Sequence, residues 1–210
     1  MKVGVIQAST RVDVNDLLYQ AVIKATQQKH DVFNLGIFPN ETVNYSYVEV
    51  AIMISLLIET GSLDFVVSGC SSGQGMMMAC NSLPGLRAGF IQTPQDAYLF
   101  GRINNGNVAS LSLGLNFGWS AELNLQYTLD KLFDGEFGIG YPPQDASRKR
   151  EEADLLLQLN SLTKKSFLDI IDQINPVLLH KVLARQDFYQ FLQENGVNQT
   201  LLDYLQAFRD

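Results

Sequence analysis

The sequence has few of the residues that build metal centres and disulfide frameworks. Its 210 residues include two cysteines and two histidines. Cys70 and Cys80 lie in one short segment and lack the C-x-x-C spacing of a metal-ligand pair. His30 and His180 lie far apart in the sequence, with no cluster of ligand residues around either. We therefore expect reduced thiols and no metal centre.

An excess of positive charge is also missing. The chain has 15 Lys and Arg against 22 Asp and Glu, which gives a formal net charge of −7. Phosphate backbones and anionic headgroups attract basic surfaces, so this balance disfavours nucleic acid and membranes as partners. A small molecule is the expected ligand.

Long apolar segments are absent as well. The longest apolar run, residues 48–58, is interrupted by Glu49 and is far shorter than the roughly 20 residues that span a bilayer. Lys2 is followed at once by strand-like residues, without the apolar run of a secretion signal. We expect a soluble, cytoplasmic protein whose 46% hydrophobic content forms one main domain and an extension.

The pattern of residues 1 to 134 predicts an α/β fold. Short apolar runs alternate with longer segments of helical period, which is typical of βα units and a parallel sheet. The expected strands are residues 2–7, 31–35, 65–68, 87–91 and 108–112. The expected helices are residues 14–28, 45–59, 75–81, 94–103 and 119–133. A Rossmann-like, three-layer fold with a five-stranded parallel sheet follows.

The composition changes around residues 135–147, where glycines and prolines indicate a connecting segment. We therefore divide the chain into an α/β domain, residues 1–145, and a helical C-terminal extension, residues 146–210. Leucines at helical spacing and a break at Asn175–Pro176 predict three or four short amphipathic helices in the extension. Their apolar stripes are expected to pack on the core or on an oligomer partner.

The most informative stretch is residues 68–75, Ser-Gly-Cys-Ser-Ser-Gly-Gln-Gly, between a strand and a helix. Ligands of open α/β sheets bind beyond the carboxyl ends of the strands, where this loop lies. Its glycines permit positive φ, and successive N–H groups at a helix N-terminus form an anion-binding nest. The nest could hold a phosphate or an enediolate oxygen. The loop lacks the Gly-Lys-Ser/Thr ending of a nucleotide-binding P-loop.

Cys70 in this loop has two interpretations. The helix dipole and the nearby N–H donors favour its thiolate, which could act as a base or, less plausibly, as a redox sensor. A cysteine between a strand and a helix is also commonly a small buried hydrophobe, and the loop alone leaves both interpretations open. Met76 to Met78 and Cys80 are better explained as core residues.

Several motifs together resemble one enzyme family. Gly69-Cys-Ser-Ser-Gly-Gln-Gly75, Ala79-Cys-Asn81 and Pro84-Gly-Leu-Arg-Ala88 are similar to the C-G-T-G-x-G, A-x-N-K and G-x-R-A motifs of the ribose-5-phosphate isomerase B / galactose-6-phosphate isomerase family. Asn44-Tyr45-Ser46-Tyr47 and Asn104-Asn-Gly-Asn-Val108 are similar to that family's D-Y-P-x-Y/F and N-D-x-N-V. The resemblance covers roughly residues 1 to 145.

The resemblance implies an aldose–ketose isomerase of a pentose or hexose phosphate that works through a cis-enediolate, without metal or other cofactor. It implies Cys70 as the base and Ser72 as the group that assists at the oxygens. The implied substrate contacts are Ser9, Tyr45, Ser71, Gly73, Gln74, Gly75, Asn104, Arg148 and Arg150. The alternative roles are packing for Tyr45 and turn formation for Asn104. The family also implies a site at a subunit interface, hence a homodimer or tetramer or a pairing with a paralogous subunit.

The sequence departs from the family pattern at two places. Gln7-Ala8-Ser9 replaces C-D-H after the first strand, and Ile103 replaces the histidine that opens the sugar ring. An isoleucine cannot transfer protons. Three explanations are open: the substrate is already open-chain, Ser9 or Tyr45 serves instead, or a paralogous subunit supplies the histidine.

The residues for an anionic substrate group are ambiguous too. Arg148 and Arg150 stand only approximately where the family has phosphate-binding arginines, and beside Glu151 and Glu152 they suit a solvated helix start slightly better. Arg11 and Arg102, near strand ends, are alternatives, so a nonphosphorylated sugar stays open. A noncatalytic sugar-phosphate-binding or regulatory subunit, or one half of a hetero-oligomeric isomerase, is the alternative function.

Overall fold

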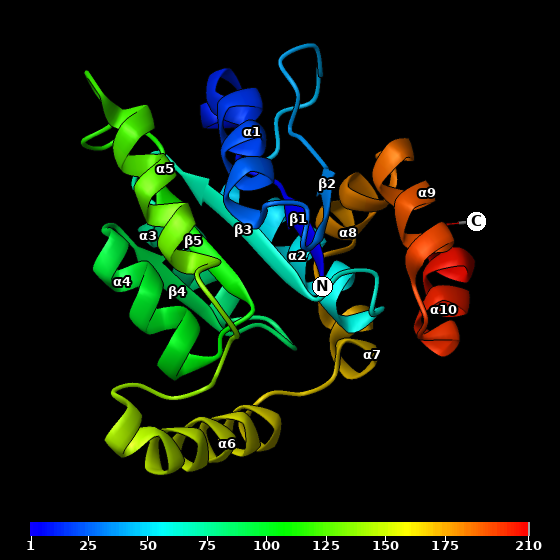
Figure 1. Cartoon of the computed structure of the whole chain (residues 1–210). Helices are drawn as coiled ribbons and strands as arrows, with labels where there is room; N and C mark the ends of the chain where they lie inside the picture. The colour runs from blue at the N-terminus through cyan, green and yellow to red at the C-terminus, as the bar shows by residue number, and fades with distance from the viewer. Residues whose placement is uncertain (210) are drawn as a thin grey trace.

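Five parallel strands form a single sheet in the computed structural model, which describes residues 1–209 (Figure 1). The strands are β1 (Lys2–Val5), β2 (Asp31–Asn34), β3 (Phe65–Cys70), β4 (Ala88–Ile91) and β5 (Val108–Ser112). Their order across the sheet is β2-β1-β3-β5-β4, and all four pairings are parallel. The predicted α/β fold with a five-stranded parallel sheet is confirmed.

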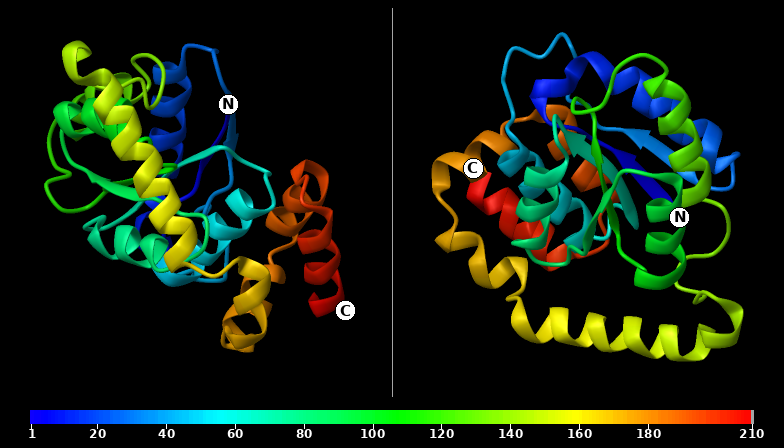
Figure 2. Two further views of the ribbon diagram at one scale, coloured as in Figure 1. Left: turned by 90° about the horizontal axis from the view of Figure 1, so that it is seen from below. Right: turned by 90° about the vertical axis from the view of Figure 1, so that its left-hand side faces the viewer.

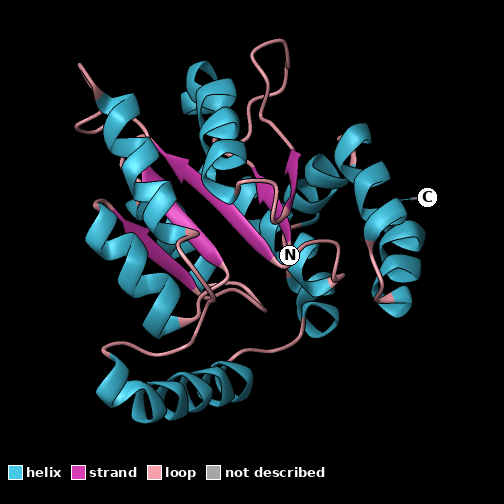
Figure 3. Ribbon diagram, viewed as in Figure 1, coloured by secondary structure: helices cyan, strands magenta, loops and turns pink. Residues whose placement is uncertain are grey.

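Helices cover both faces of the sheet, so the fold has three layers (Figure 3). One face carries α1 (Asn15–Thr26), α4 (Pro94–Leu99) and α5 (Ala121–Leu132), and the other carries α2 (Tyr47–Glu59) and α3 (Gln74–Asn81). Side chains alternate between the two cores along each strand. In β3, Phe65 and Val67 join the first core, whereas Val66 and Cys70 join the second.

The expected element boundaries agree with the structure to within two residues over most of this region. The exception is the helix expected over residues 94–103. There α4 ends at Leu99, and one π-helical turn, Phe100–Asn104, follows it. Capping explains the sharp start of α2: the Ser46 side chain accepts a hydrogen bond from the Val48 N–H, and Glu49 completes a capping box.

The extension contains more helices than the three or four expected. They are α6 (Ala146–Thr163), α7 (Phe167–Ile170), α8 (Pro176–Leu183), α9 (Gln186–Asn195) and α10 (Gln199–Arg209). The break at Asn175–Pro176 is confirmed: the Asn175 side chain caps α8 at the Val177 N–H, and Pro176 is its first residue. The short α7 was missed because a single capping box, Ser166 with Asp169, starts it.

Helices α7 and α8 pack against α2, and α9 and α10 pack against α8 and join the same core (Figure 2). Residues 49–57 of α2 are all buried, which a helix with only one covered side could not achieve. The extension contributes large buried side chains to this core, among them Phe167, Leu179, Phe188, Leu192 and Leu202. The expected packing of its apolar stripes is confirmed for these helices.

The first helix of the extension behaves differently. Figures 1 and 2 show α6 as a long helix along one side of the molecule. Leu155, Leu159 and Leu162 on this helix are 57%, 57% and 81% exposed, so its leucines do not enter the core of the chain. No helix in residues 1–209 is both long enough and apolar enough to cross a membrane.

Candidate active site

The predicted loops meet at the carboxyl edge of the sheet. Cys70 is the last residue of β3 and pairs in register with Ser112, the last residue of β5. On the other side of β3, the Ala8 N–H donates to the Gly69 carbonyl over 3.0 Å. The segment after β1 therefore lies directly beside the Cys70 loop, as the parallel arrangement requires.

The Cys70 loop is held in a specific conformation. The Gly73 N–H donates to Cys70 Sγ over 3.2 Å, and the Ser110 hydroxyl donates to the Gly73 carbonyl over 2.7 Å. Gly73 has φ +75°, and a Cβ there would lie 2.6 Å from the Phe90 ring and 2.8 Å from the Leu111 carbonyl oxygen. Only glycine fits this position. The result is a thiol that is 8% exposed and faces a backbone N–H donor.

The same loop presents N–H groups that could hold an anion. The backbone N–H groups of Ser71, Ser72, Gln74 and Gly75 have no hydrogen-bond partner within residues 1–209. They lie in the loop and the first turn of α3, where the helix dipole is positive. The Ser72 hydroxyl is likewise unpaired within the described chain and partly exposed. Cys70 therefore stands beside a cluster of donors suited to a developing oxyanion.

The loop after β5 supports the Cys70 loop from the other side. The Ser71 carbonyl accepts hydrogen bonds from the Gly114 N–H at 2.9 Å and the Leu115 N–H at 2.7 Å, and from the Ser112 hydroxyl at 3.2 Å. Sequence reasoning missed these supports and that of Ser110. The signal was available, because Ser110 and Ser112 are polar residues in an otherwise apolar strand.

Ser9 and Tyr45 lie together next to this loop. The Ser9 hydroxyl accepts the Tyr45 N–H over 2.7 Å, and the Ser9 N–H donates to the Tyr45 carbonyl over 2.9 Å. The Tyr45 ring is 4% exposed, with Lys181 Nζ 5.3 Å and Arg185 Cζ 5.9 Å from its centroid. Burial raises the pKa of Tyr45. Its packing against the extension is clear, and its substrate contact stays a prediction.

A buried arginine of the extension ties it to the segment after β2. Arg185 makes a bidentate pair with Glu41, at 3.0 Å and 2.8 Å, and donates to the Leu35 carbonyl over 2.6 Å. Its side chain is 4% exposed. No sequence pattern indicated this pair, since 144 residues separate the partners.

A second pair links the extension to the start of α2. The Glu49 carboxylate accepts from Lys181 Nζ at 2.5 Å, from the Ser46 N–H at 2.6 Å and from the Ser46 hydroxyl. Burial alone raises the pKa of Glu49, but the hydrogen bonds from Lys181 and Ser46 outweigh it and hold that pKa below its ordinary range.

This pair makes stability depend on pH. A carboxyl whose pKa is lowered by folding stabilises the protein above its unfolded pKa of about 4.3, and that contribution is lost as pH falls through the folded pKa. Glu49→Gln is expected to lower the free energy of unfolding at pH 7 by about 1–3 kcal/mol, with a smaller difference at pH 3. Urea denaturation at both pH values measures it. Glu152→Gln, at an exposed ion pair, is the control and should change little. A cost equal at both pH values would attribute the effect to packing instead.

Three predicted contacts do not reach Cys70 within one chain. Asn104 precedes the amino end of β5, whereas Cys70 lies level with the carboxyl end of that strand, so the two are roughly 13 Å or more apart. Asn104 lines a pocket of about 270 Å³ that also contacts Leu156 of α6. Arg148 pairs with Glu152 at 2.5 Å, and Arg150 donates to the Ile139 carbonyl at 2.9 Å.

The two alternative arginines differ sharply. Arg102 is 1% exposed and donates to the carbonyls of Asp134 and Leu132, so it caps the end of α5 and cannot reach a ligand at the carboxyl edge. Arg11 lies in the 3₁₀ segment Ser9–Val14 after β1, beside the Cys70 loop.

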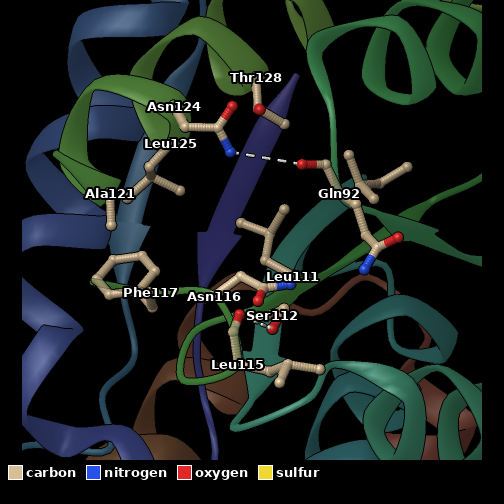
Figure 4. Close-up of a pocket in the computed structure, with 11 residues that line it drawn as sticks. Gln92, Leu111, Ser112, Leu115, Asn116, Phe117, Ala121, Asn124, Leu125 and Thr128 are labelled. Carbon is tan, nitrogen blue, oxygen red and sulfur yellow. Dashed lines mark hydrogen bonds between the residues drawn. The ribbon is translucent and has the colours of Figure 1, made fainter. Parts of the chain in front are cut away.

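A small pocket opens next to Ser112 (Figure 4). Its cavity volume is about 80 Å³, far below the roughly 300 Å³ of ordinary ligand sites. The Asn124 side chain spans it to the Gln92 carbonyl over 3.5 Å, and Thr128 Oγ1 is buried there without a partner. The pocket is too small for a sugar and does not change the location of the site.

Cys80 provides a contrast to Cys70. It is fully buried in the core under α3, and burial raises the pKa of its thiol to about 12. The prediction that Met76 and Cys80 are core residues is confirmed, but the same prediction is wrong for Met78, which is 65% exposed because it lies on the solvent side of α3. Within residues 1–209, no three His, Cys, Asp or Glu side chains gather as a group that could hold a metal ion.

The Cys70 thiol and the unpaired N–H groups of its loop thus lie together at the carboxyl edge of a parallel sheet. A family model described as Ribose/Galactose Isomerase matches residues 3–126, and the chain belongs to that family. The predicted family and enzyme class are confirmed. Comparison with curated proteins returns no match.

Solved structures extend the similarity to the whole chain. A 4-deoxy-L-threo-5-hexosulose-uronate ketol-isomerase complexed with a tartrate is 34% identical, with 99% of each chain covered and a TM-score of 0.94. A ribose-5-phosphate isomerase from Vibrio parahaemolyticus is 30% identical, with 99% of each chain covered and a TM-score of 0.93. The Thermotoga maritima ribose 5-phosphate isomerase shares the fold at 22% identity and a TM-score of 0.57, but covers 73% of this chain and 97% of its own.

Proposed function

We propose that this protein is a ketol-isomerase of an open-chain sugar acid, with Cys70 as the base. The observation that carries the proposal is the Cys70 thiol, which accepts the Gly73 N–H and stands beside the unpaired N–H groups of its loop. Abstraction of a proton next to a carbonyl creates an enediolate, and such donors stabilise its negative oxygen.

The reaction needs only proton movements. The Cys70 thiolate takes the proton from C2 of an aldose, and the electron pair forms the C1–C2 double bond of a cis-enediolate. The same thiol then returns a proton to C1, while the hydroxyl proton on O2 passes to O1. Ser72, whose hydroxyl is unpaired within residues 1–209, is suited to that transfer. An aldose becomes a ketose with no net loss of atoms or electrons.

The replacement of the ring-opening histidine by Ile103 supports an open-chain substrate. A 4-deoxy-5-hexosulose uronate, named for the similar ketol-isomerase, has an aldehyde at C1, a ketone at C5 and a carboxylate at C6. It lacks the C4 and C5 hydroxyls through which sugars close five- and six-membered rings. An enzyme for this substrate has no such ring to open, so it does not need a proton-transferring residue in place of Ile103.

The subunit arrangement is part of the proposal. Asn104 lies at the edge of the sheet away from Cys70, under an α6 whose leucines are exposed. A second copy that covers these leucines would bury apolar surface. We propose a homodimer in which Asn104, Arg148 and Arg150 serve the partner's site.

Substrate preference tests the proposal. In D₂O, the protein is expected to convert 4-deoxy-L-threo-5-hexosulose uronate with deuterium entering C1 of the product. Its kcat/KM for this compound should exceed those for ribose 5-phosphate and galactose 6-phosphate by about 100-fold. Preference for either phosphate would reject a sugar acid as the substrate but would still support the isomerase reaction. Thermal stabilisation by a phosphate without any turnover would instead support the noncatalytic binding subunit.

A further inference from the structure

Arg11 is a half-buried cation next to the proposed site that the reaction so far does not use. Its side chain is 16% exposed, and its guanidinium lies over the Phe117 ring at 5.4 Å from the centroid. The residue interrupts its 3₁₀ segment with φ −136° and ψ 39°, so the backbone departs from helical geometry where this side chain leaves it.

The hydrogen bonds of Arg11 use one edge of the guanidinium only. Nε donates to Asp13 Oδ1 at 3.0 Å, and Nη2 donates to Asp13 Oδ2 at 2.8 Å. Nη1 has no hydrogen-bond partner within residues 1–209. An arginine can bind a second acceptor on this remaining side, because its five donors form a rigid fork.

Gly114 keeps this unpaired nitrogen close to the Cys70 loop. A methyl group on Gly114 would lie 3.0 Å from Arg11 Nη1 and also 3.0 Å from the Ser71 carbonyl oxygen. That carbonyl is already satisfied by the N–H groups of Gly114 and Leu115, so it does not require the arginine. Nη1 therefore approaches the residue that follows Cys70 with its donors available.

We propose that Arg11 Nη1 binds the terminal carboxylate of the substrate and selects for sugar acids. This inference rests on the proposed function. In an extended six-carbon chain the carboxyl carbon lies about 5 Å from C2, given C–C bonds of about 1.5 Å. A substrate with C2 at Cys70 can thus place its carboxylate beyond Ser71, on the side of Arg11.

Asp13 occupies one edge of the Arg11 guanidinium only. Its carboxylate neutralises much of the guanidinium charge, and Arg11 in turn holds the pKa of Asp13 below its ordinary range. Removal of the Asp13 charge is therefore expected to strengthen the attraction of Arg11 for an anion on its unpaired side.

The test uses tartrate, a dicarboxylate, as a probe of binding that needs no turnover, together with uronate kinetics. Arg11→Gln is expected to weaken tartrate binding by about 10- to 100-fold, as the loss of a charge-assisted hydrogen bond does. It should raise KM for the uronate by a similar factor and change kcat less.

Asp13→Asn separates this role from a purely structural ion pair. If Arg11 acts only by bonding Asp13, both variants lose binding alike, and the inference is overturned. If Arg11 is the ligand, Asp13→Asn binds tartrate at least as tightly as the wild type. Lys131→Gln, at an exposed lysine, controls for net charge. Circular dichroism checks that each variant is folded.

The outcomes distinguish this inference from the proposed function. Arg11-dependent tartrate binding without isomerisation of the uronate would reject the proposed reaction and keep the carboxylate site. Wild-type KM and tartrate affinity in folded Arg11→Gln, with isomerisation intact, would reject the carboxylate site and keep the reaction.

Discussion

Cys70→Ala is expected to lower kcat by about 10³-fold, because it removes the proposed base that carries the proton between C1 and C2. Cys70 is a buried residue at the end of β3, but the change to alanine removes only its sulfur atom, so the variant should still fold. The measurement is deuterium incorporation into the sugar during turnover, which reports proton transfer even when net conversion is slow.

Cys80→Ala is the matched control for this experiment. The chain has only these two cysteines, and Cys80 lies buried in the core with a thiol pKa raised to about 12. Its replacement should leave the exchange rate unchanged and cost about 1 kcal/mol of stability. If Cys70→Ala exchanges deuterium at the wild-type rate, another group is the base and the proposed mechanism is wrong.

Activity is expected to return when the subunits of two inactive variants are mixed. In the proposed dimer, Cys70 of one subunit works with Asn104 of the other. A heterodimer of Cys70→Ala and Asn104→Ala subunits then has one site with both residues intact. Random mixing makes half of the dimers heterodimers, so about one quarter of the wild-type activity should return. The assay is initial rate after the two chains are unfolded and refolded together.

The control for this mixing experiment uses variants that cannot form the dimer. Glutamate at Leu159 and Leu162 places charges on the exposed leucine stripe of α6, and mass photometry should then show monomers. Mixtures of the two inactive variants that also carry these changes should show no gain in activity. Activity of the plain mixture no higher than the average of its two components would show that Asn104 does not act across subunits.

The features that the sequence predicted are those encoded locally. Strand and helix boundaries follow from apolar period and from caps such as Ser46 and Asn175, each within a few residues of what it caps. The Cys70 nest is a continuous stretch of chain, so its strand-loop-helix context was visible too. The number of helices in the extension was not, because α7 has only four residues, which are too few to show a helical period.

The parts of the site that the sequence did not predict join distant segments. Arg185 pairs with Glu41, which is 144 residues away in the sequence. Arg11 lies close to Ser71 because Gly114, in the loop after β5, has no side chain to separate them. No periodicity or composition relates such residues, because only the folded chain brings them into contact. The placement of Asn104 away from Cys70 is different, because it follows from the predicted parallel sheet: Asn104 precedes β5, whereas Cys70 ends β3.

The burial of α2 on all sides limits how this enzyme can be divided or recombined. Its outer surface is as apolar as its inner one and is matched by Phe167, Leu179 and Phe188 of the extension. Without the extension, this outer surface would be an exposed apolar patch of the kind that leads to aggregation. The helix and the C-terminal segment therefore have to be inherited together. A chimera that exchanges one without the other would expose an apolar surface and aggregate.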